Sequence, residues 1–207
     1  MAGQVTLKTA SGGTLTVTPA DTAGTPILTF PAETGNLIST GTTTRAIPKA
    51  AMPTGAILQV VSITKTDVAS TTSQTWADIS GLSVSITPSS VSSKILVIYN
   101  FHGANDNGGG FVKLVRNSTD IAVGTAATGN QINVTVGNYY NTDTNTTVDM
   151  GGSYLDSPAS SSSVTYKAQF RVGTTGGTLV INRNVSNGNF AYTGVGTSTI
   201  TLMEVAV

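Results

Sequence analysis

The chain has 207 residues, of which 39% are hydrophobic and only 10% are charged, with ten basic side chains balancing ten acidic ones. A formal net charge of zero argues against nucleic acid or an anionic membrane as the main partner, because both attract basic proteins. With no cysteine, the chain can form neither a disulfide nor a cysteine-ligated zinc site.

The residue types favour strands over helices. Thr and Val are abundant, whereas Lys, Glu and Leu, the usual material of helix surfaces, are scarce. The first residues, MAGQVTLKT, lack the apolar centre of a secretory signal, and the longest apolar runs, such as 56–61, are too short to span a bilayer. The sequence therefore predicts a soluble all-β protein without an export signal.

Residues 1–50 are expected to form a β-rich N-terminal arm. Strand-like pieces at 5–8, 15–18 and 27–30 alternate with Pro/Gly turns, and the segment 14–36 nearly repeats itself after about twelve residues. The arm holds too few large apolar residues for a core of its own, so these residues are expected to pack on other copies of the chain or on a larger particle. The candidate assembly and attachment residues are Leu15, Val17, Ile27, Leu28 and Phe30.

Residues 51–207 are expected to fold as a β-sandwich. Apolar and polar residues alternate strictly over 164–172, as in a half-buried strand. The stretch 94–99 is apolar at every position after its lysine, which predicts a strand covered on both faces. The other strands are expected at 57–65, 74–79, 82–86, 111–116, 120–123, 132–136, 146–150, 179–182, 190–193 and 198–205. Short antiparallel strands without helical periodicity favour a jelly-roll-like arrangement of two sheets.

Motifs of catalysis and cofactor binding are missing from the sequence. The single histidine, His102, has no Gly-x-Ser-x-Gly elbow to accompany it, and the scattered carboxylates show no spacing that selects a catalytic pair. The stretch 105–110 has the oxygen donors of a calcium loop but no glutamate that would close it, so a glycine-rich hairpin tip is favoured. We expect no enzymatic activity, no metal and no cofactor.

One aromatic cluster is a candidate glycan contact. Tyr139, Tyr140 and Asn141 combine aromatic rings with an amide, the side chains that stack on sugars and bind their hydroxyl groups. The alternative, which we favour, is that both tyrosines pack in the core or in a subunit interface.

Several segments resemble small tail-fibre and head-fibre proteins of tailed bacteriophages, particularly those of marine phages. The segments are 13–25, 28–37, 76–88, 114–121, 154–159 and 197–204. The resemblance implies a homotrimer on the exterior of a virion, with its N-terminal end fixed to the major capsid protein or another virion protein and the β-sandwich exposed. It transfers no functional residue to a position of this chain.

Two functions are compatible with these features. The first, favoured by the short length and balanced charge, is a non-enzymatic capsid decoration, cement or head-fibre protein. The second is a tail-fibre module that binds glycan on the host surface. A polysaccharide-degrading fibre is disfavoured, because its β-helix needs far longer repeats than this arm contains.

Overall fold

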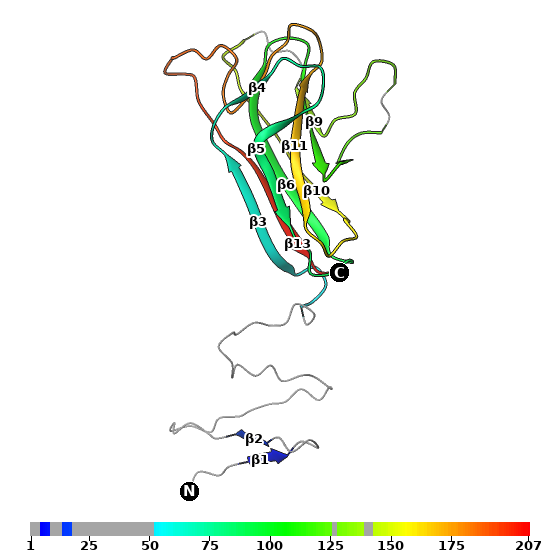
Figure 1. Cartoon of the computed structure of the whole chain (residues 1–207). Coiled ribbons are helices and arrows are strands. Elements are labelled where there is room, and N and C mark those ends of the chain that lie inside the picture. Colours follow the sequence, from blue (N-terminus) through cyan, green and yellow to red (C-terminus); the bar gives the residue numbers. More distant parts are fainter. Residues whose placement is uncertain (1–4, 9–13, 18–51, 126–127, 139–142) are drawn as a thin grey trace. The chain divides into compact units, whose positions relative to one another are not determined.

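The computed structural model describes residues 5–8, 14–17, 52–125, 128–138 and 143–207. The chain divides into two compact units, Met1–Ala46 and Ile47–Val207. Strands, turns and irregular segments make up the described residues, which contain no helix, so the predicted all-β class is confirmed (Figure 1). Accordingly, those residues include no helix that could cross a bilayer.

The described part of the first unit is a two-stranded antiparallel sheet. It consists of β1 (Val5–Lys8) and β2 (Thr14–Val17), close to two of the predicted strands. The register joins apolar residues: Val5 with Val17 and Leu7 with Leu15. Two strands alone are marginally stable in water, so this sheet needs other surfaces to pack on. The other candidate assembly residues lie outside the described residues: Ile27, Leu28 and Phe30.

The second unit is a sandwich of two antiparallel sheets. The first sheet has six strands in the order β3-β13-β6-β12-β4, with β10 also paired to β6: β3 (Ile57–Lys65), β4 (Ala69–Thr71), β6 (Lys94–Asn105), β10 (Val148–Asp156), β12 (Leu179–Ile181) and β13 (Ser198–Val205). The second has five strands in the order β5-β11-β7-β8, with β9 also paired to β7: β5 (Ala77–Ile86), β7 (Gly110–Arg116), β8 (Thr119–Ile121), β9 (Val136–Asn138) and β11 (Val164–Val172).

The strand order is that of a jelly roll. Eight of the strands in the second unit form this pattern. In chain order they are β3, β5, β6, β7, β8, β10, β11 and β13. The first sheet places the first, eighth, third and sixth of them side by side, and the second sheet places the second, seventh, fourth and fifth. This interleaving of two Greek keys confirms the predicted jelly-roll-like sandwich.

The core lies between the two sheets. The strict alternation predicted for β11 is confirmed, since every second residue from Val164 to Val172 is buried and the intervening ones are not. The largest side chains in this core include Phe101 and Tyr166 from opposite sheets, together with Leu82, Leu114 and Leu202. The sandwich therefore has a continuous apolar core of its own.

Strand β6 is covered on one face only, which corrects the prediction for 94–99. Ile95 and Val97 are fully buried between the sheets, whereas Ile98 is 40% exposed on the other face. Within the described residues the second sheet packs on the inner face alone. The apolar residues of the outer face are thus left open to a partner.

Strand β5 merges two strands predicted at 74–79 and 82–86. The register with β11 shifts between Lys167 and Gln169, so β5 carries extra residues there. Gly81 in this bulge has a φ of 82°, a conformation that glycine adopts without steric cost. The bulge lets a single strand continue through the glycine.

The strand predicted at 190–193 is wrong, because this segment forms a turn. The Thr193 hydroxyl donates to the carbonyl oxygens of Gly188 and Phe190 at 2.6 and 2.9 Å, and the Phe190 N–H donates back to that hydroxyl. A threonine that bonds to the local backbone in this way competes with sheet formation.

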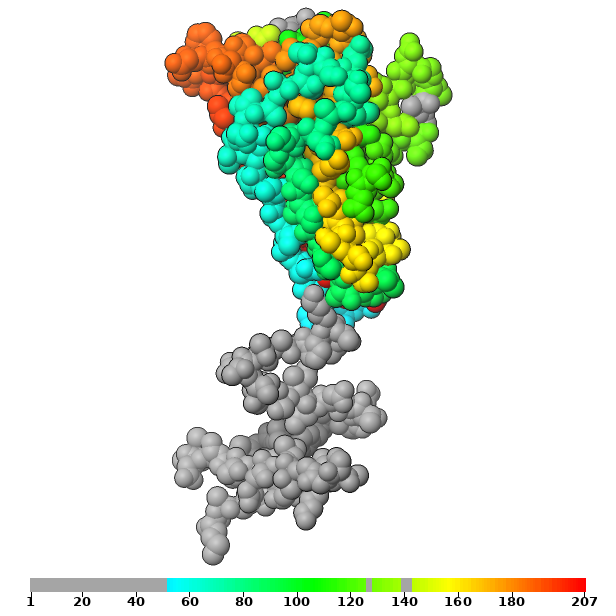
Figure 2. Space-filling view, viewed as in Figure 1, coloured from blue at the N-terminus to red at the C-terminus, as the bar shows by residue number. Residues whose placement is uncertain are grey.

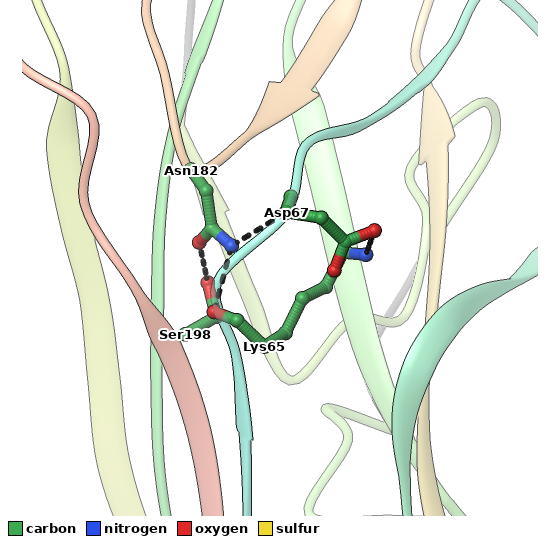
Figure 3. A network of polar contacts seen from close by, with 4 residues as sticks. All are labelled: Lys65, Asp67, Asn182 and Ser198. Carbon is green, nitrogen blue, oxygen red and sulfur yellow. Dashed lines mark hydrogen bonds and ion pairs between the residues drawn. The ribbon is translucent and has the colours of Figure 1, made fainter.

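A buried amide joins three segments of the first sheet (Figure 3). Asn182, which is fully buried, donates to the carbonyl oxygens of Lys65 and Asp67, both at 2.8 Å. Its own oxygen accepts the Ser198 hydroxyl at 2.6 Å. The end of β12, the start of β13 and the turn after β3 are thereby held together.

Replacing this amide is expected to destabilise the sandwich. Asn182→Ala leaves two carbonyl oxygens and one hydroxyl without their partner, which costs about 2 kcal/mol. Asn187→Ala is the matched control, because Asn187 is exposed and has a similar positive φ of 52°. Urea denaturation should show the larger loss for Asn182→Ala, and equal losses in the two variants would contradict the role of the network.

A candidate ligand groove beside the second sheet

A groove of about 1070 Å³ lies between the outer face of the second sheet and the described residues Gly124 and 129–134. In Figure 2 the light-green segment that follows β8 stands out from the side of the sandwich. The described lining residues are Gln74, Gly108, Phe111, Gly124, Gly129, Asn130, Gln131, Ile132, Asn133, Val134, Arg171, Gly173 and Thr174. A groove of this size can hold a small organic ligand or several sugar rings.

Phe111 supplies the aromatic surface of the groove, and glycines set the place of its ring. A Cβ added at Gly137 would lie 2.7 Å from this ring, and one at Gly173 would lie 2.9 Å from it. These contacts are shorter than side chains tolerate, so only glycine fits at either position. The half-buried ring is therefore fixed before any ligand arrives.

Arg171 lies next to Phe111 and supplies a positive charge. The two residues are directly opposite in the register of β11 and β7. The Arg171 Nε donates to the Val172 carbonyl oxygen at 3.1 Å, and its guanidinium carbon lies 5.8 Å from the centre of the Trp76 ring. The ring face attracts the cation. Backbone and aromatic contacts thus hold the guanidinium beside the groove.

The other cations on this sheet face are already paired. Lys113 lies 2.8 Å from Asp120 and also over the Trp76 ring, and Lys167 lies 2.8 Å from Asp78. The hydrogen bond from Lys167, and then that from Gln169, lowers the pKa of Asp78. Arg171, in contrast, forms no ion pair with any described residue. Its charge is available to an anion in the groove.

The remaining polar groups of the groove are amides and hydroxyls. Gln74 donates to the Gly173 carbonyl oxygen at 3.0 Å and accepts the Thr175 hydroxyl, which fixes its orientation. Gln131 accepts the backbone N–H of Thr128 at 3.1 Å. Amides both donate and accept hydrogen bonds, as sugar hydroxyls require.

The predicted glycan contacts Tyr139, Tyr140 and Asn141 lie outside the described residues. The groove residues were not predicted from the sequence, in which Arg171 is only one of the polar residues that alternate with apolar ones over 164–172. The available signal was the set of glycines around Phe111, which fall in three separate segments: Gly109, Gly137 and Gly173. Their relation becomes visible only once the strands are paired.

The single histidine belongs to an exposed polar network. His102 Nδ1 donates to Asp149 at 2.9 Å, and this bond, followed by the one from Asn100, lowers the pKa of the Asp149 carboxyl. The Ser198 hydroxyl accepts the His102 backbone N–H and is itself committed to Asn182. The imidazole thus has an orienting carboxylate, and the expectation that it is not catalytic stays a prediction.

The stretch 105–110 links β6 to β7 as a tight turn. Asp106 accepts the Thr178 backbone N–H at 2.6 Å, and Gly108 and Gly109 both have positive φ. Asn105 is buried, and its amide has no hydrogen-bond partner among the described residues. Among all the residues that the structure describes, no three His, Asp or Glu side chains gather closely enough to hold a metal ion.

Two aromatic rings stand exposed at the loop after β12. Phe190 and Tyr192 are stacked nearly parallel, with ring centres 5.1 Å apart, and Tyr192 is 73% exposed. This loop lies at the end of the sandwich away from the C-terminus, at the top of Figure 1. It offers an aromatic surface separate from the groove.

An apolar row crosses the outer face of the first sheet. Register pairs Val60 with Met203, Met203 with Leu96, and Leu96 with Leu155, so the row runs over four neighbouring strands. Val60 is 53% and Leu155 48% exposed, while the two middle residues are half-buried. Continuous exposed apolar surface of this kind is typical of an interface.

A scan of protein-family models and a search of curated protein sequences give no match to this chain. The resemblance to phage fibre proteins therefore rests on the sequence segments alone.

Proposed function

We propose that this protein is a non-enzymatic structural protein of a tailed-bacteriophage virion, of the capsid-decoration, cement or head-fibre type. It assembles as a homotrimer and is anchored through its N-terminal arm to the major capsid protein or another virion protein. The β-sandwich stands on the outside of the particle. The phage-like segments support the virion setting, and the jelly roll is compatible with it.

The apolar row on the outer face of the first sheet is the main observation in support of the proposed homotrimer. Valine, leucine and methionine side chains lie side by side across four strands without cover from the described residues. Burying each one against another copy contributes roughly 1.5–3 kcal/mol. The sequence of β6 has the pattern of a strand covered on both faces, and a neighbouring subunit would supply the second cover.

The trimer can be tested by placing charge in the row. The full chain is expected to be trimeric by light scattering, and the double variant V60D/L155D monomeric, because carboxylates cannot be buried in an apolar contact. A control, S80D/S83D, puts the same charge on exposed positions of β5 and should remain trimeric. A monomeric wild type, or a V60D/L155D trimer, would contradict the proposed interface.

The place on the particle needs a second measurement. Mass spectrometry and electron microscopy of purified virions should find the protein in many copies over the capsid shell. Its absence from virions would refute a structural role. A few copies at the tail tip would favour receptor binding instead.

The second candidate function is a tail-fibre module that binds host-surface glycan. The groove beside the second sheet favours it, since a fixed aromatic ring, several amides and a guanidinium with no ion-pair partner among the described residues converge there. Trimerisation and glycan binding use opposite faces of the sandwich, so the two functions are compatible.

A further inference from the structure

We propose that the groove binds an oligosaccharide that carries an anionic group, a carboxylate or a sulfate, placed on Arg171. The acidic sugar lies against the Phe111 ring, and its hydroxyls bond to the amides on either side. The inference rests on the second candidate function and narrows its ligand to acidic sugars.

The charge of the groove selects an anion. Arg171 is the only ionisable side chain among the described lining residues, and no carboxylate lies there to compete for it. The neighbouring cations are neutralised by Asp120 and Asp78. A guanidinium with free donors recognises carboxylate and sulfate oxygens by paired hydrogen bonds.

The neutral part of the groove selects a sugar rather than a simple salt. Phe111 provides an apolar surface beside the cation, and Gln74, Asn130 and Gln131 surround it with amides. Because glycines fix the ring, little conformational entropy is lost when a sugar settles on it. A single cation on a chain of zero net charge gives no basis for binding nucleic acid.

The test compares acidic and neutral probes. Calorimetric titration of the full chain with oligogalacturonate, a sulfated galactan oligomer and a neutral galactan oligomer separates carboxylate, sulfate and neutral sugars. At least one acidic probe is expected to bind about tenfold more tightly than the neutral one, the value of a charge-assisted hydrogen bond. Equal affinity for acidic and neutral probes would overturn the inference and leave the second candidate function in place.

A substitution of Arg171 tests whether its charge contributes to ligand binding without contributing to the stability of the fold. R171Q is expected to reduce acidic-probe binding about tenfold and to leave the thermal midpoint unchanged. K167Q is the matched control, because Lys167 lies on the same face of β11 but not in the groove, and it should bind as the wild type does. Unchanged binding by R171Q would overturn the inference.

A separate variant tests the contribution of the Phe111 ring to ligand binding. G137A forces the Phe111 ring to move and is expected to weaken binding of acidic and neutral probes alike, whereas R171Q affects the acidic probe alone. If none of the probes binds at millimolar concentration, the inference is overturned together with the glycan-binding function, and the trimer is unaffected.

Discussion

The variant D156A is expected to lose about 3–5 kcal/mol of unfolding free energy, the cost of breaking a buried ion pair by removing one partner. Asp156 ends β10, and its carboxylate is almost completely buried. Arg116 Nη1 donates to both of its oxygens at 2.7 and 2.8 Å, and the Tyr166 hydroxyl donates at 2.7 Å. The Asp156 carboxylate thus accepts hydrogen bonds from a guanidinium and from a phenol hydroxyl at the same time.

Removing Asp156 leaves the buried Tyr166 hydroxyl without this acceptor, and Arg116 Nη1 keeps only the Ser157 carbonyl oxygen at 3.3 Å. Burial first, and then the hydrogen bond to Asp156, raises the pKa of Tyr166 above its ordinary value. The phenol therefore stays protonated and needs an acceptor at every ordinary pH. The double variant D156A/Y166F removes the stranded hydroxyl and is expected to regain about 1 kcal/mol relative to D156A.

Guanidinium denaturation monitored by circular dichroism measures these losses. D78A is the matched control, because Asp78 forms an ion pair of the same 2.8 Å length with Lys167 at the exposed surface. Exposed pairs contribute about 0–1 kcal/mol. A loss in D156A no larger than that in D78A would show that the buried network does not stabilise the sandwich.

Strand positions were predictable from sequence where one face of a strand is buried. The alternation over 164–172 predicted β11 with its correct bounds, since its burial pattern follows the apolar pattern residue by residue. Ser198–Val205 was also predicted with its correct bounds, although two of its buried residues, Ser198 and Glu204, are polar. The uniform apolar run in β6 was misleading, because the sequence does not say whether the second cover is another sheet or another chain. The turn at Thr193 is held by hydrogen bonds between its hydroxyl and the local backbone, and such bonds leave no periodic pattern in the sequence from which a turn could be predicted.

The groove could not be predicted, because its parts lie far apart in sequence. Phe111 and Arg171 become neighbours only through the pairing of β7 with β11, and Gln74 joins them from the segment before β5. Arg171 differs from Lys167 by lacking a carboxylate partner among the described residues, a property of three-dimensional position and not of residue type. The glycines that seat Phe111 give a sequence signal only after the ring is placed.

The last strand of the sandwich holds a second buried carboxylate, at Glu204. This fully buried side chain accepts the Ser89 backbone N–H at 2.6 Å, the Ser93 hydroxyl at 2.8 Å and the Gln59 amide at 2.6 Å. It ties the turn before β6 to β13 and β3. The same end of the sandwich is closed by backbone bonds between 55–56 and Ala206.

The variant E204Q is expected to lose about 3 kcal/mol of unfolding free energy at neutral pH, because an amide cannot accept all of these donors. Burial alone would raise the pKa of Glu204, but the hydrogen bonds from Ser89, Ser93 and Gln59 outweigh it and hold the pKa below its ordinary value. A carboxyl whose pKa is lowered by folding stabilises the protein above its unfolded pKa, and this contribution is lost as the pH falls through the folded value.

The stability gap between wild type and E204Q should therefore be constant from neutral pH down to about pH 5 and narrow below it. Urea denaturation of both proteins at several pH values between about 3 and 7 measures the gap. For D78N the gap should have the same sign but remain smaller, since solvent screens that exposed carboxylate. A gap that does not narrow in acid would mean that Glu204 acts by its shape alone. In that case its charge would contribute nothing to holding the turn against β13.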